Sequence, residues 1–308
     1  MSGSELTVII PFKNEKEEVL ATVNSIIAAA ENSIDIILIN DGSDDGYDYS
    51  VLENVNNLKY IHHETSWGVA ASREHGVSLA ETEYFLLLDA HMRSHTLHWD
   101  TLLLRELKKD PNALFCCLTT ELDGTGFRGY GVTVDWTTLA PTWNLTDSSP
   151  DDTVSIVPCL MGASYCTNVK FWKRIKGVEG LKSYGFDEQF MCLKTNLSGG
   201  KCKVIKNVEF GHKFRVIESV PYTIHHKEYI YNALLIIELL YPLEQKVKTF
   251  ISLRSQFPRD DFNNAIDLIK HNRNRIKEYK EYLITILKYD LVEFVNKAGI
   301  CNINNVLN

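Results

Sequence analysis

The sequence predicts an α/β protein with a mostly parallel sheet and a helical C-terminal part. Over the first hundred residues, short β-rich apolar runs alternate with segments whose apolar residues recur at helical spacing, as in successive βαβ units. One of these runs, residues 84–88, is apolar throughout, which is typical of a buried strand. From Lys227 onward the pattern is helical. We therefore expect a main domain over residues 1–225 and a helical extension over residues 226–308 that packs on it.

The first βαβ unit begins with residues 7–11, a β-rich run that we expect to end at its proline. Asn14 is predicted to cap the following helix, with Glu17 three residues later as in a capping box. Apolar residues then recur at helical spacing. Residues 34–39 form a second predicted strand, which a segment rich in Asn, Asp and Gly closes.

The alternation continues with a short strand over residues 58–61, a helix over residues 69–79 and the strand over residues 84–88. Residues 119–155 interrupt it, because they are rich in Thr, Gly, Asp and Trp and predict extended segments joined by long loops. Residues 262–295 are charged and carry apolar residues at helical intervals. They predict two amphipathic helices that pack on the main domain or on a partner.

The composition is that of an ordinary globular protein. The chain has 308 residues, of which 44% are hydrophobic and 23% charged. Its net charge of -8 argues against a general nucleic-acid binder but permits a local basic patch. Seven cysteines form no CxxC pair, which favours reduced thiols in a cytoplasmic protein. With no basic-then-apolar start and no uncharged stretch of membrane-spanning length, we expect neither a signal peptide nor a membrane span.

The clearest chemical signal is Asp89-Ala90-His91, directly after the apolar run. Strand side chains repeat with period two, so the carboxylate and the imidazole leave the strand on the same side and can reach one metal ion. In open α/β sheets, ligands collect at the carboxyl ends of strands. The pattern therefore predicts a metal that holds a phosphorylated ligand. The alternative is an aspartate that only ends the strand or caps a helix.

Several short motifs occur in an order that resembles the GT-A-fold nucleotide-sugar glycosyltransferases. A strand with Pro11, Asn14 and Glu15, a second strand that ends in Asn-Asp-Gly-Ser at residues 40–43, and the segment 67–76 resemble the start of these enzymes. In the last segment, Glu-His stands where Asn-x is usual. Asp89-Ala90-His91 stands at their metal motif in its D-x-H form, which is the form of the polypeptide N-acetylgalactosaminyltransferases.

The later chain supports this narrower resemblance. Residues 157–163, 171–177, 184–188, 198–200 and 211–215 are similar, in that order, to the family segments T-P-x-M-A-G-G, F-x-x-I-G, W-G-G-E-N, C-G-G and G-H-x-F-R. The similarity implies a GT-A fold, a Rossmann-like mixed and mostly parallel sheet flanked by helices. We expect neither the C-terminal lectin domain nor the Golgi anchor of the animal enzymes.

The resemblance implies that Asp89, His91 and His212 bind a divalent metal, Mn²⁺ or Mg²⁺. It places Asp187 and Glu188 at the catalytic segment. In inverting relatives, a carboxylate at the position of Glu188 is the general base. In retaining relatives, the segment contacts the donor sugar and the leaving phosphate takes the proton. The D-x-H form favours retention, although the acidic pair keeps inversion open.

The resemblance also implies a donor site. Asp41 would bind the uracil, and Arg73 would pair with the diphosphate or brace the base. The alternatives are a turn residue for Asp41 and a surface charge for Arg73. The segment from Arg215 to His226 resembles a loop that closes over the nucleotide, or is only a polar surface loop. The predicted nucleotide-sugar-binding residues are Pro11, Phe12, Asn14, Asp41, Arg73, Asp89, Gly162, Ala163 and Arg215.

We therefore predict a bacterial or phage glycosyltransferase. It would move a hexose or N-acetylhexosamine from a UDP-sugar to a hydroxyl of a protein, a glycan or a modified DNA base, and an oligomer is possible. The main alternative is a phage-type DNA glycosyltransferase for hydroxymethylated pyrimidines, with Lys-rich clusters at residues 170–176 and 201–206 and stacking on Trp136 or Trp143.

Two other functions rank lower. A nucleotidyltransferase would need a glycine-rich basic loop after the first strand, and the chain has none there. A non-catalytic nucleotide-sugar-binding protein would have no need to keep Asp89, His91 and His212 together.

Overall fold

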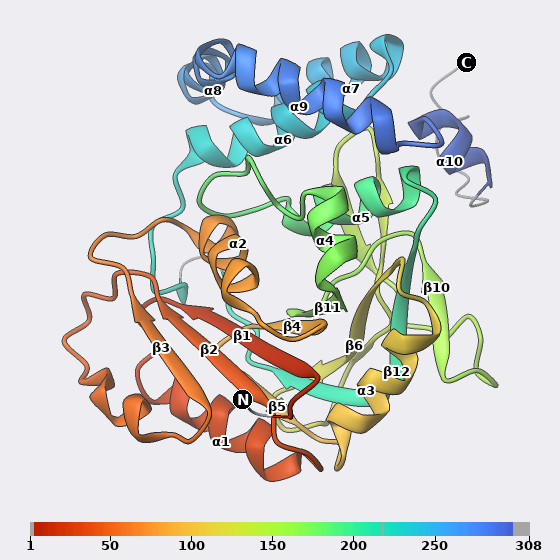
Figure 1. Cartoon of the computed structure of the whole chain (residues 1–308). Coiled ribbons are helices and arrows are strands. Elements are labelled where there is room, and N and C mark those ends of the chain that lie inside the picture. The colour runs from red at the N-terminus through yellow and green to blue at the C-terminus, as the bar shows by residue number, and fades with distance from the viewer. Residues whose placement is uncertain (1–2, 217–218, 298–308) are drawn as a thin grey trace.

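The structure, a computed structural model, describes residues 3–216 and 219–297. Within these residues, a ten-stranded mixed sheet carries helices on both faces, and further helices cover one of these layers (Figure 1). Eight strands follow in the order β10-β12-β6-β11-β4-β1-β2-β3, while β5 pairs with β12 and β7 pairs with β6. Strands β8 and β9 form a separate hairpin.

The strands, in chain order, are β1 (Leu6–Phe12), β2 (Asp35–Asn40), β3 (Leu58–His62), β4 (Tyr84–Leu88), β5 (Met92–Ser94), β6 (Ala113–Glu121), β7 (Arg128–Gly129), β8 (Val132–Asp135), β9 (Ala140–Trp143), β10 (Val154–Val157), β11 (Ser164–Asn168) and β12 (Lys201–His212). The helices are α1 (Glu17–Ala29), α2 (Val69–Leu79), α3 (Trp99–Lys109), α4 (Val169–Ile175), α5 (Asp187–Leu197), α6 (His226–Leu240), α7 (Leu243–Gln256), α8 (Arg259–His271), α9 (Arg273–Ile286) and α10 (Leu291–Lys297), with a 3-10 turn η1 (Tyr49–Asn54).

The sheet is parallel through β3, β2, β1 and β4, and again where β6 pairs with β12. Strand β11 runs antiparallel between β4 and β6, and it joins the two parallel parts into one mixed sheet. The predicted strands and the helix over residues 69–79 are confirmed, as are the extended segments and loops of residues 119–155.

Both faces of the sheet are buried, which explains why its strands are apolar throughout. Ile9 and Leu87 belong to a core that includes α2, α4 and α5. Their neighbours Val8 and Leu86 belong to a second core with α1 and α3 on the other face. The alternation follows from the period of two residues along a strand.

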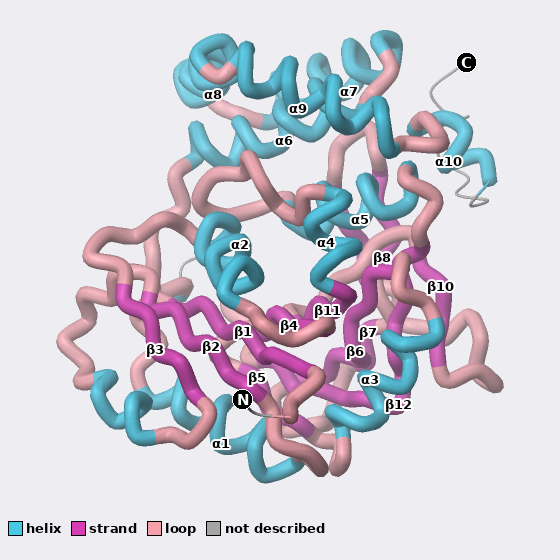
Figure 2. Tube along the Cα trace, viewed as in Figure 1, coloured by secondary structure: helices cyan, strands magenta, loops and turns pink. Residues whose placement is uncertain are grey.

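The chain is helical from α6 to its last described residue (Figure 2). Most residues of α6 are buried, and they share the core of α4 and α5. Helices α8 and α9 then pack on α6. Among the described residues, no helix is both long and apolar enough to cross a membrane. The division into a main domain over residues 1–225 and a helical extension from residue 226 stays a prediction.

The predicted N-cap at Asn14 is wrong. Helix α1 begins at Glu17 after Lys16, and no side chain caps it. Asn14 has a positive φ of 58°, and its side chain binds elsewhere. Its amide nitrogen donates to Oδ1 of Asp44 at 2.8 Å and to the carbonyl of Pro221 at 3.0 Å. Long-range partners thus replace the local capping bond and attach two loops to the end of β1.

Strand β1 also continues one residue beyond Pro11. Its pairing with β4 stops at Ile9, while its pairing with β2 continues to Phe12. The proline therefore lies where the strand is paired on one side only, and a missing N–H is tolerated there.

The prediction of two helices over residues 262–295 is wrong in number, since three helices, α8, α9 and α10, lie across this range of the described chain. Helix α10 starts with a capping box. The Glu293 N–H donates to Oδ1 of Asp290 at 2.9 Å, and the Asp290 N–H donates to Oε2 of Glu293 at 3.0 Å. This Asp-x-x-Glu pattern is visible in the sequence and marks the extra helix start.

Candidate active site

A cavity of about 1150 Å³ opens at the carboxyl ends of β1, β2 and β4. This is where a parallel sheet binds ligands, because strand ends leave side chains and loop backbone free to converge. All the predicted site residues except Arg215 line it. The cavity also reaches the β8–β9 hairpin and helices α6 and α7. The sequence did not predict that these elements line the site.

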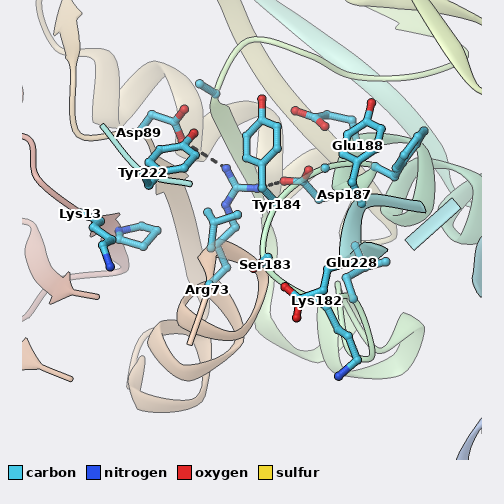
Figure 3. Close-up of a pocket in the computed structure, with 18 of the residues that line it drawn as sticks. Lys13, Arg73, Asp89, Lys182, Ser183, Tyr184, Asp187, Glu188, Tyr222 and Glu228 are labelled. Carbon is cyan, nitrogen blue, oxygen red and sulfur yellow. Dashed lines mark hydrogen bonds and ion pairs between the residues drawn. The ribbon is translucent and has the colours of Figure 1, made fainter. Parts of the chain in front are cut away.

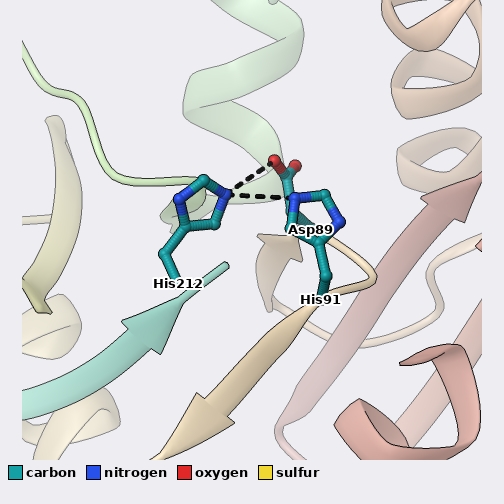
Figure 4. A group of neighbouring side chains, drawn as sticks. All are labelled: Asp89, His91 and His212. Atoms are coloured by element: carbon teal, nitrogen blue, oxygen red, sulfur yellow. Dashed lines mark hydrogen bonds and ion pairs between the residues drawn. The ribbon is translucent and has the colours of Figure 1, made fainter. Parts of the chain in front are cut away.

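The three predicted metal ligands lie together (Figure 4). Asp89 follows β4, and His91 precedes β5. Strand β5 pairs with the end of β12, with Met92 opposite His212, and this pairing brings the two histidines face to face. Nε2 of His212 lies 3.1 Å from Nε2 of His91 and 3.8 Å from Oδ2 of Asp89.

This arrangement fits a divalent cation. Burial and the neighbouring His91 lower the pKa of His212 to about 4, although Asp89 opposes this shift. His212 is therefore neutral at pH 7, with a lone pair for a metal. Ligand atoms of Asp89, His91 and His212 all lie within 4.8 Å of one another. Two imidazoles and a carboxylate suit Mn²⁺, and also permit Mg²⁺.

Glu15 and Arg215 form a pair beside this cluster. The guanidinium donates to both carboxylate oxygens of Glu15, at 2.7 and 2.6 Å. Oε1 of Glu15 also lies 3.2 Å from Nδ1 of His91. Burial raises the pKa of Glu15, but Arg215 and His91 outweigh it and lower the pKa to about 2. The carboxylate thus stays charged and can orient His91 from the side away from His212.

Arg73 is buried, so the alternative of a surface charge is wrong. Its guanidinium donates to Asp187 and, at 3.1 Å, to Oδ1 of Asp89 (Figure 3). Burial disfavours the charged form, but Asp89 raises the pKa of Arg73 above its usual value. The side chain therefore joins α2, α5 and the end of β4. Contact with a diphosphate stays a prediction.

Glu188 is also engaged. Its carboxylate accepts a hydrogen bond from the buried hydroxyl of Tyr165 on β11. In this state neither Asp187 nor Glu188 is a free carboxylate, since each is held by another side chain of the site. Their catalytic role stays a prediction.

Asp41 has a structural task that the sequence did not reveal. It is buried, and both of its oxygens accept hydrogen bonds. Burial raises its pKa, but these bonds lower it below its usual value. Asp41 thus fixes the loop that leads into α2, and a bond to uracil stays a prediction. Its donors are Nδ1 of His63 (2.8 Å), Oγ of Ser66 (2.7 Å), N of Trp67 (2.8 Å), N of Gly68 (2.9 Å) and Oγ of Ser72 (2.9 Å).

Aromatic side chains stack beside Asp41. The exposed indole of Trp67 lies on His63, with ring centroids 3.9 Å apart, and Nε2 of His63 contacts Nδ1 of His75 at 2.9 Å. His75 stands in a segment where the family pattern departs from this sequence. This departure from the family pattern was the sequence feature that could have indicated the cluster of Trp67, His63 and His75.

Gly162 leaves no space for a side chain. Its φ is 119°, and a Cβ atom there would lie 1.9 Å from Oγ1 of Thr119. The carbonyl of Ala163 accepts from the N–H of Asp89 at 3.0 Å. Ala163 therefore fixes the backbone at Asp89, directly after β4. The small residues Gly162 and Ala163 line the cavity there.

The two tryptophans predicted to stack on a base differ. Trp136 is buried and packs on Phe294 of α10, so it is not available to a ligand and that prediction is wrong. Trp143 lines the cavity and contacts Phe127 and Phe214 edge-on.

The comparisons with known proteins agree with this geometry. Residues 7–139 match the model of the glycosyl transferase family 2. The chain is 26% identical over 117 residues to the uncharacterized glycosyltransferase YibD of Escherichia coli (strain K12), which is 37% of this chain and 34% of that protein. It is 22% identical over 225 residues to polypeptide N-acetylgalactosaminyltransferase 16 of Homo sapiens, 68% of this chain and 40% of that protein. The chain thus spans two fifths or less of these relatives.

Solved structures show the same fold. A crystal structure of GalNAc-T7 with UDP, GalNAc and Mn²⁺ superposes with a TM-score of 0.68 at 18% identity, and covers 88% of this chain and 57% of that one. A crystal structure of S. aureus TarS 1–349 in complex with UDP-GlcNAc gives 0.55 at 16% identity, over 96% and 92% of the two chains. This chain thus has the GT-A fold of these solved structures, and its sequence resembles the glycosyl transferase family 2 and the polypeptide N-acetylgalactosaminyltransferases.

Proposed function

We propose that the protein transfers a hexose or N-acetylhexosamine from a UDP-sugar to an acceptor hydroxyl with the help of a divalent metal. The observation that carries this proposal is the convergence of Asp89, His91 and His212 at the strand ends, inside a cavity large enough for two substrates. Solved neighbours of the same fold contain UDP with Mn²⁺ and UDP-GlcNAc, which supports UDP as the nucleotide.

Mn²⁺ or Mg²⁺, held by Asp89, His91 and His212, would neutralise the negative charge of the departing diphosphate. The protein's own residues prepare this site. Oε1 of Glu15 lies 3.2 Å from Nδ1 of His91, and Arg215 keeps Glu15 charged. Arg73 balances the charge that Asp89 and Asp187 bring to the cavity.

Retention of the anomeric configuration is part of the proposal. It rests on the resemblance of the D-x-H motif to that of retaining relatives, in which the leaving phosphate takes the proton. Glu188 accepts a bond from Tyr165 and Asp187 is paired with Arg73, each through one carboxylate oxygen, so the acidic pair keeps inversion as the alternative. Proton NMR of the product should show the anomeric configuration of the donor, and an inverted product would exclude this mechanism.

A DNA acceptor is less favoured. Two of the three lysines of the 201–206 cluster are paired, Lys203 with Asp110 and Lys206 with Asp147, both at 2.7 Å. Trp136 is unavailable for stacking. A cytoplasmic location, a bacterial or phage origin and an oligomer stay predictions.

The test is release of UDP from a panel of UDP-sugars, with and without Mn²⁺. We expect release with at least one UDP-hexose or UDP-N-acetylhexosamine, and its loss with a chelator. A sample that binds the donor but releases no UDP under any metal would favour the non-catalytic alternative. Release of pyrophosphate from a sugar phosphate and UTP would favour a nucleotidyltransferase.

A further inference from the structure

The cavity has two ends. Lys13 lies at one side, and Glu228 and Lys182 lie at the other, with Arg73 between them (Figure 3). The side of Lys13 contains the loops after β1 and β2, where the predicted nucleotide residues lie. The other side is formed by the β8–β9 hairpin, the loop before α5, and the helices α6 and α7. We call this second end the distal arm.

The size of the cavity calls for a second ligand. Its volume of about 1150 Å³ exceeds the roughly 300–1,000 Å³ that is usual for one small-molecule site. The donor and metal residues occupy the end at the sheet, so the distal arm is left for the acceptor.

Unpaired acceptor atoms mark the distal arm. Gln189 is 5% exposed, and its Nε2 donates to the carbonyl of Leu139 at 3.0 Å. Its Oε1 is buried and has no partner among the described residues. The half-buried carboxylate of Glu228 likewise has no hydrogen bond or ion pair within the described chain. Such atoms require donors, and a buried amide oxygen without one is costly.

Aromatic rings form the wall beside these atoms. Tyr229 packs on Phe186, with ring centroids 4.5 Å apart, and on Phe257, with centroids 6.1 Å apart. All three rings line the cavity. A flat apolar wall next to hydrogen-bond acceptors suits a pyranose ring, which has apolar C–H faces and hydroxyl donors at its edge.

The distal arm has little net charge of its own. Among the described residues that line it, Glu228 and Lys182 carry opposite charges. A neutral sugar needs no counter-charge there, whereas a polyanion such as DNA would find a single lysine beside a carboxylate.

We infer that the distal arm binds a neutral glycan acceptor, with Gln189 and Glu228 accepting from its hydroxyls and Tyr229 and Phe257 packing on its rings. This rests on the proposed function. The bond between the donor's anomeric carbon and the β-phosphate oxygen breaks, and a bond from that carbon to the acceptor oxygen forms. The acceptor's proton goes to the phosphate, so the products are UDP and a glycan longer by one sugar.

The test separates the two arms of the cavity. UDP release without acceptor reports on donor and metal, and transfer to a panel of neutral di- to tetrasaccharides reports on the distal arm. We expect Phe257→Ala and Glu228→Gln to raise the KM for the saccharide about tenfold or more, and to leave acceptor-free UDP release and the donor KM within twofold. Phe250→Ala, on α7 but outside the cavity lining, is the matched control and should change neither.

Three outcomes overturn the inference while leaving the proposed function intact. These are transfer to a Ser/Thr peptide but to no saccharide, transfer to hydroxymethylated DNA but to no saccharide, and saccharide transfer that F257A and E228Q do not weaken. By contrast, absence of UDP release and of transfer with every donor would contradict the proposed function itself. A thermal melt of each variant identifies any that fail to fold.

Discussion

At the scale of single residues, the site depends on charged groups that are each held by a second residue. Glu15 contacts His91 and is itself held by Arg215, while Arg73 connects Asp89 with Asp187. Charges buried in this way need partners, because an unpaired buried charge is costly. A substitution at one such residue should therefore alter its partner's position as well as its charge.

His212→Ala should abolish metal-dependent activity much as Asp89→Ala does. Each removes one of three ligands, so we expect at least about a 100-fold loss of UDP release and much weaker Mn²⁺ binding. Calorimetric titration of Mn²⁺ measures the binding directly. His271→Ala, an exposed histidine on α8, is the control. If H212A binds Mn²⁺ as the wild type does, the D-x-H assignment fails, although a broader GT-A site could remain.

The pair of Glu15 and Arg215 predicts a pH dependence of stability. The folded pKa of Glu15 is about 2, below the ordinary 4.5, so its contribution is present above pH 4.5 and is lost as the pH falls toward 2. The shift corresponds to at most about 3 kcal/mol. In metal-free urea denaturation, wild type should exceed Glu15→Gln in stability at pH 6, and the difference should shrink by pH 3.

The control for this titration is Glu17→Gln, because Glu17 is exposed at the start of α1. Its stability relative to wild type should not follow this pH profile. A difference between wild type and E15Q that stays constant from pH 6 to pH 3 would contradict the assigned ion pair.

At the scale of elements, helix α6 shapes the cavity through one buried side chain. Oδ1 of Asn232 accepts from the N–H of Lys182 at 2.8 Å, and its Nδ2 donates to the carbonyls of Lys182 and Gly185 at 2.8 and 3.0 Å. The loop before α5 has no regular secondary structure, so these bonds determine its position. The position of α6 on the core therefore affects the position of the loop that lines the cavity.

Asn232→Ala should destabilise the protein by about 2–4 kcal/mol, since it leaves several buried backbone groups without partners. We also expect a higher KM for the acceptor, because Lys182 and Gly185 line the cavity. Urea denaturation and steady-state kinetics measure the two effects. Asn263→Ala, an exposed asparagine on α8, should change neither. Unaltered stability of N232A would show that the loop is held by other contacts.

At the scale of the whole molecule, the sheet and the C-terminal helices share one core. Ile230, Leu235 and Ile237 of α6 are buried with Phe190 of α5 and Ile175 of α4. Burial of each large apolar side chain contributes about 1.5–3 kcal/mol. The helices after residue 225 therefore contribute to the stability of the main domain, and they also form part of its cavity.

A chain that ends at residue 225 should not fold cooperatively, because it would expose this core to water. Circular dichroism on heating should show no sharp transition, and the dye ANS should bind to the exposed apolar surface. A chain that ends at residue 290 lacks only α10 among the described helices, and should fold with a lower Tm. A sharp transition of the 1–225 chain would show that the main domain folds alone.

The local sequence pattern was sufficient to predict much of this structure. The strands up to residue 88, helix α2 and the position of Asp-x-His follow from the period and composition of short segments, because neighbours in sequence decide them. Motif order through residues 6–245 was sufficient to predict the GT-A fold and to place His212 beside Asp89 and His91. Asn14 is the exception, since distant partners displaced its local cap.

Only the tertiary structure decided how the site is held and what lies around it. The pairing of β5 with β12, the attachment of Glu15 to Arg215 and the engagement of Asp41 by five donors all join segments that are separated in the chain. The distal arm likewise forms where a hairpin, a loop and two C-terminal helices meet. Such contacts depend on packing between elements, and no local period or composition encodes them.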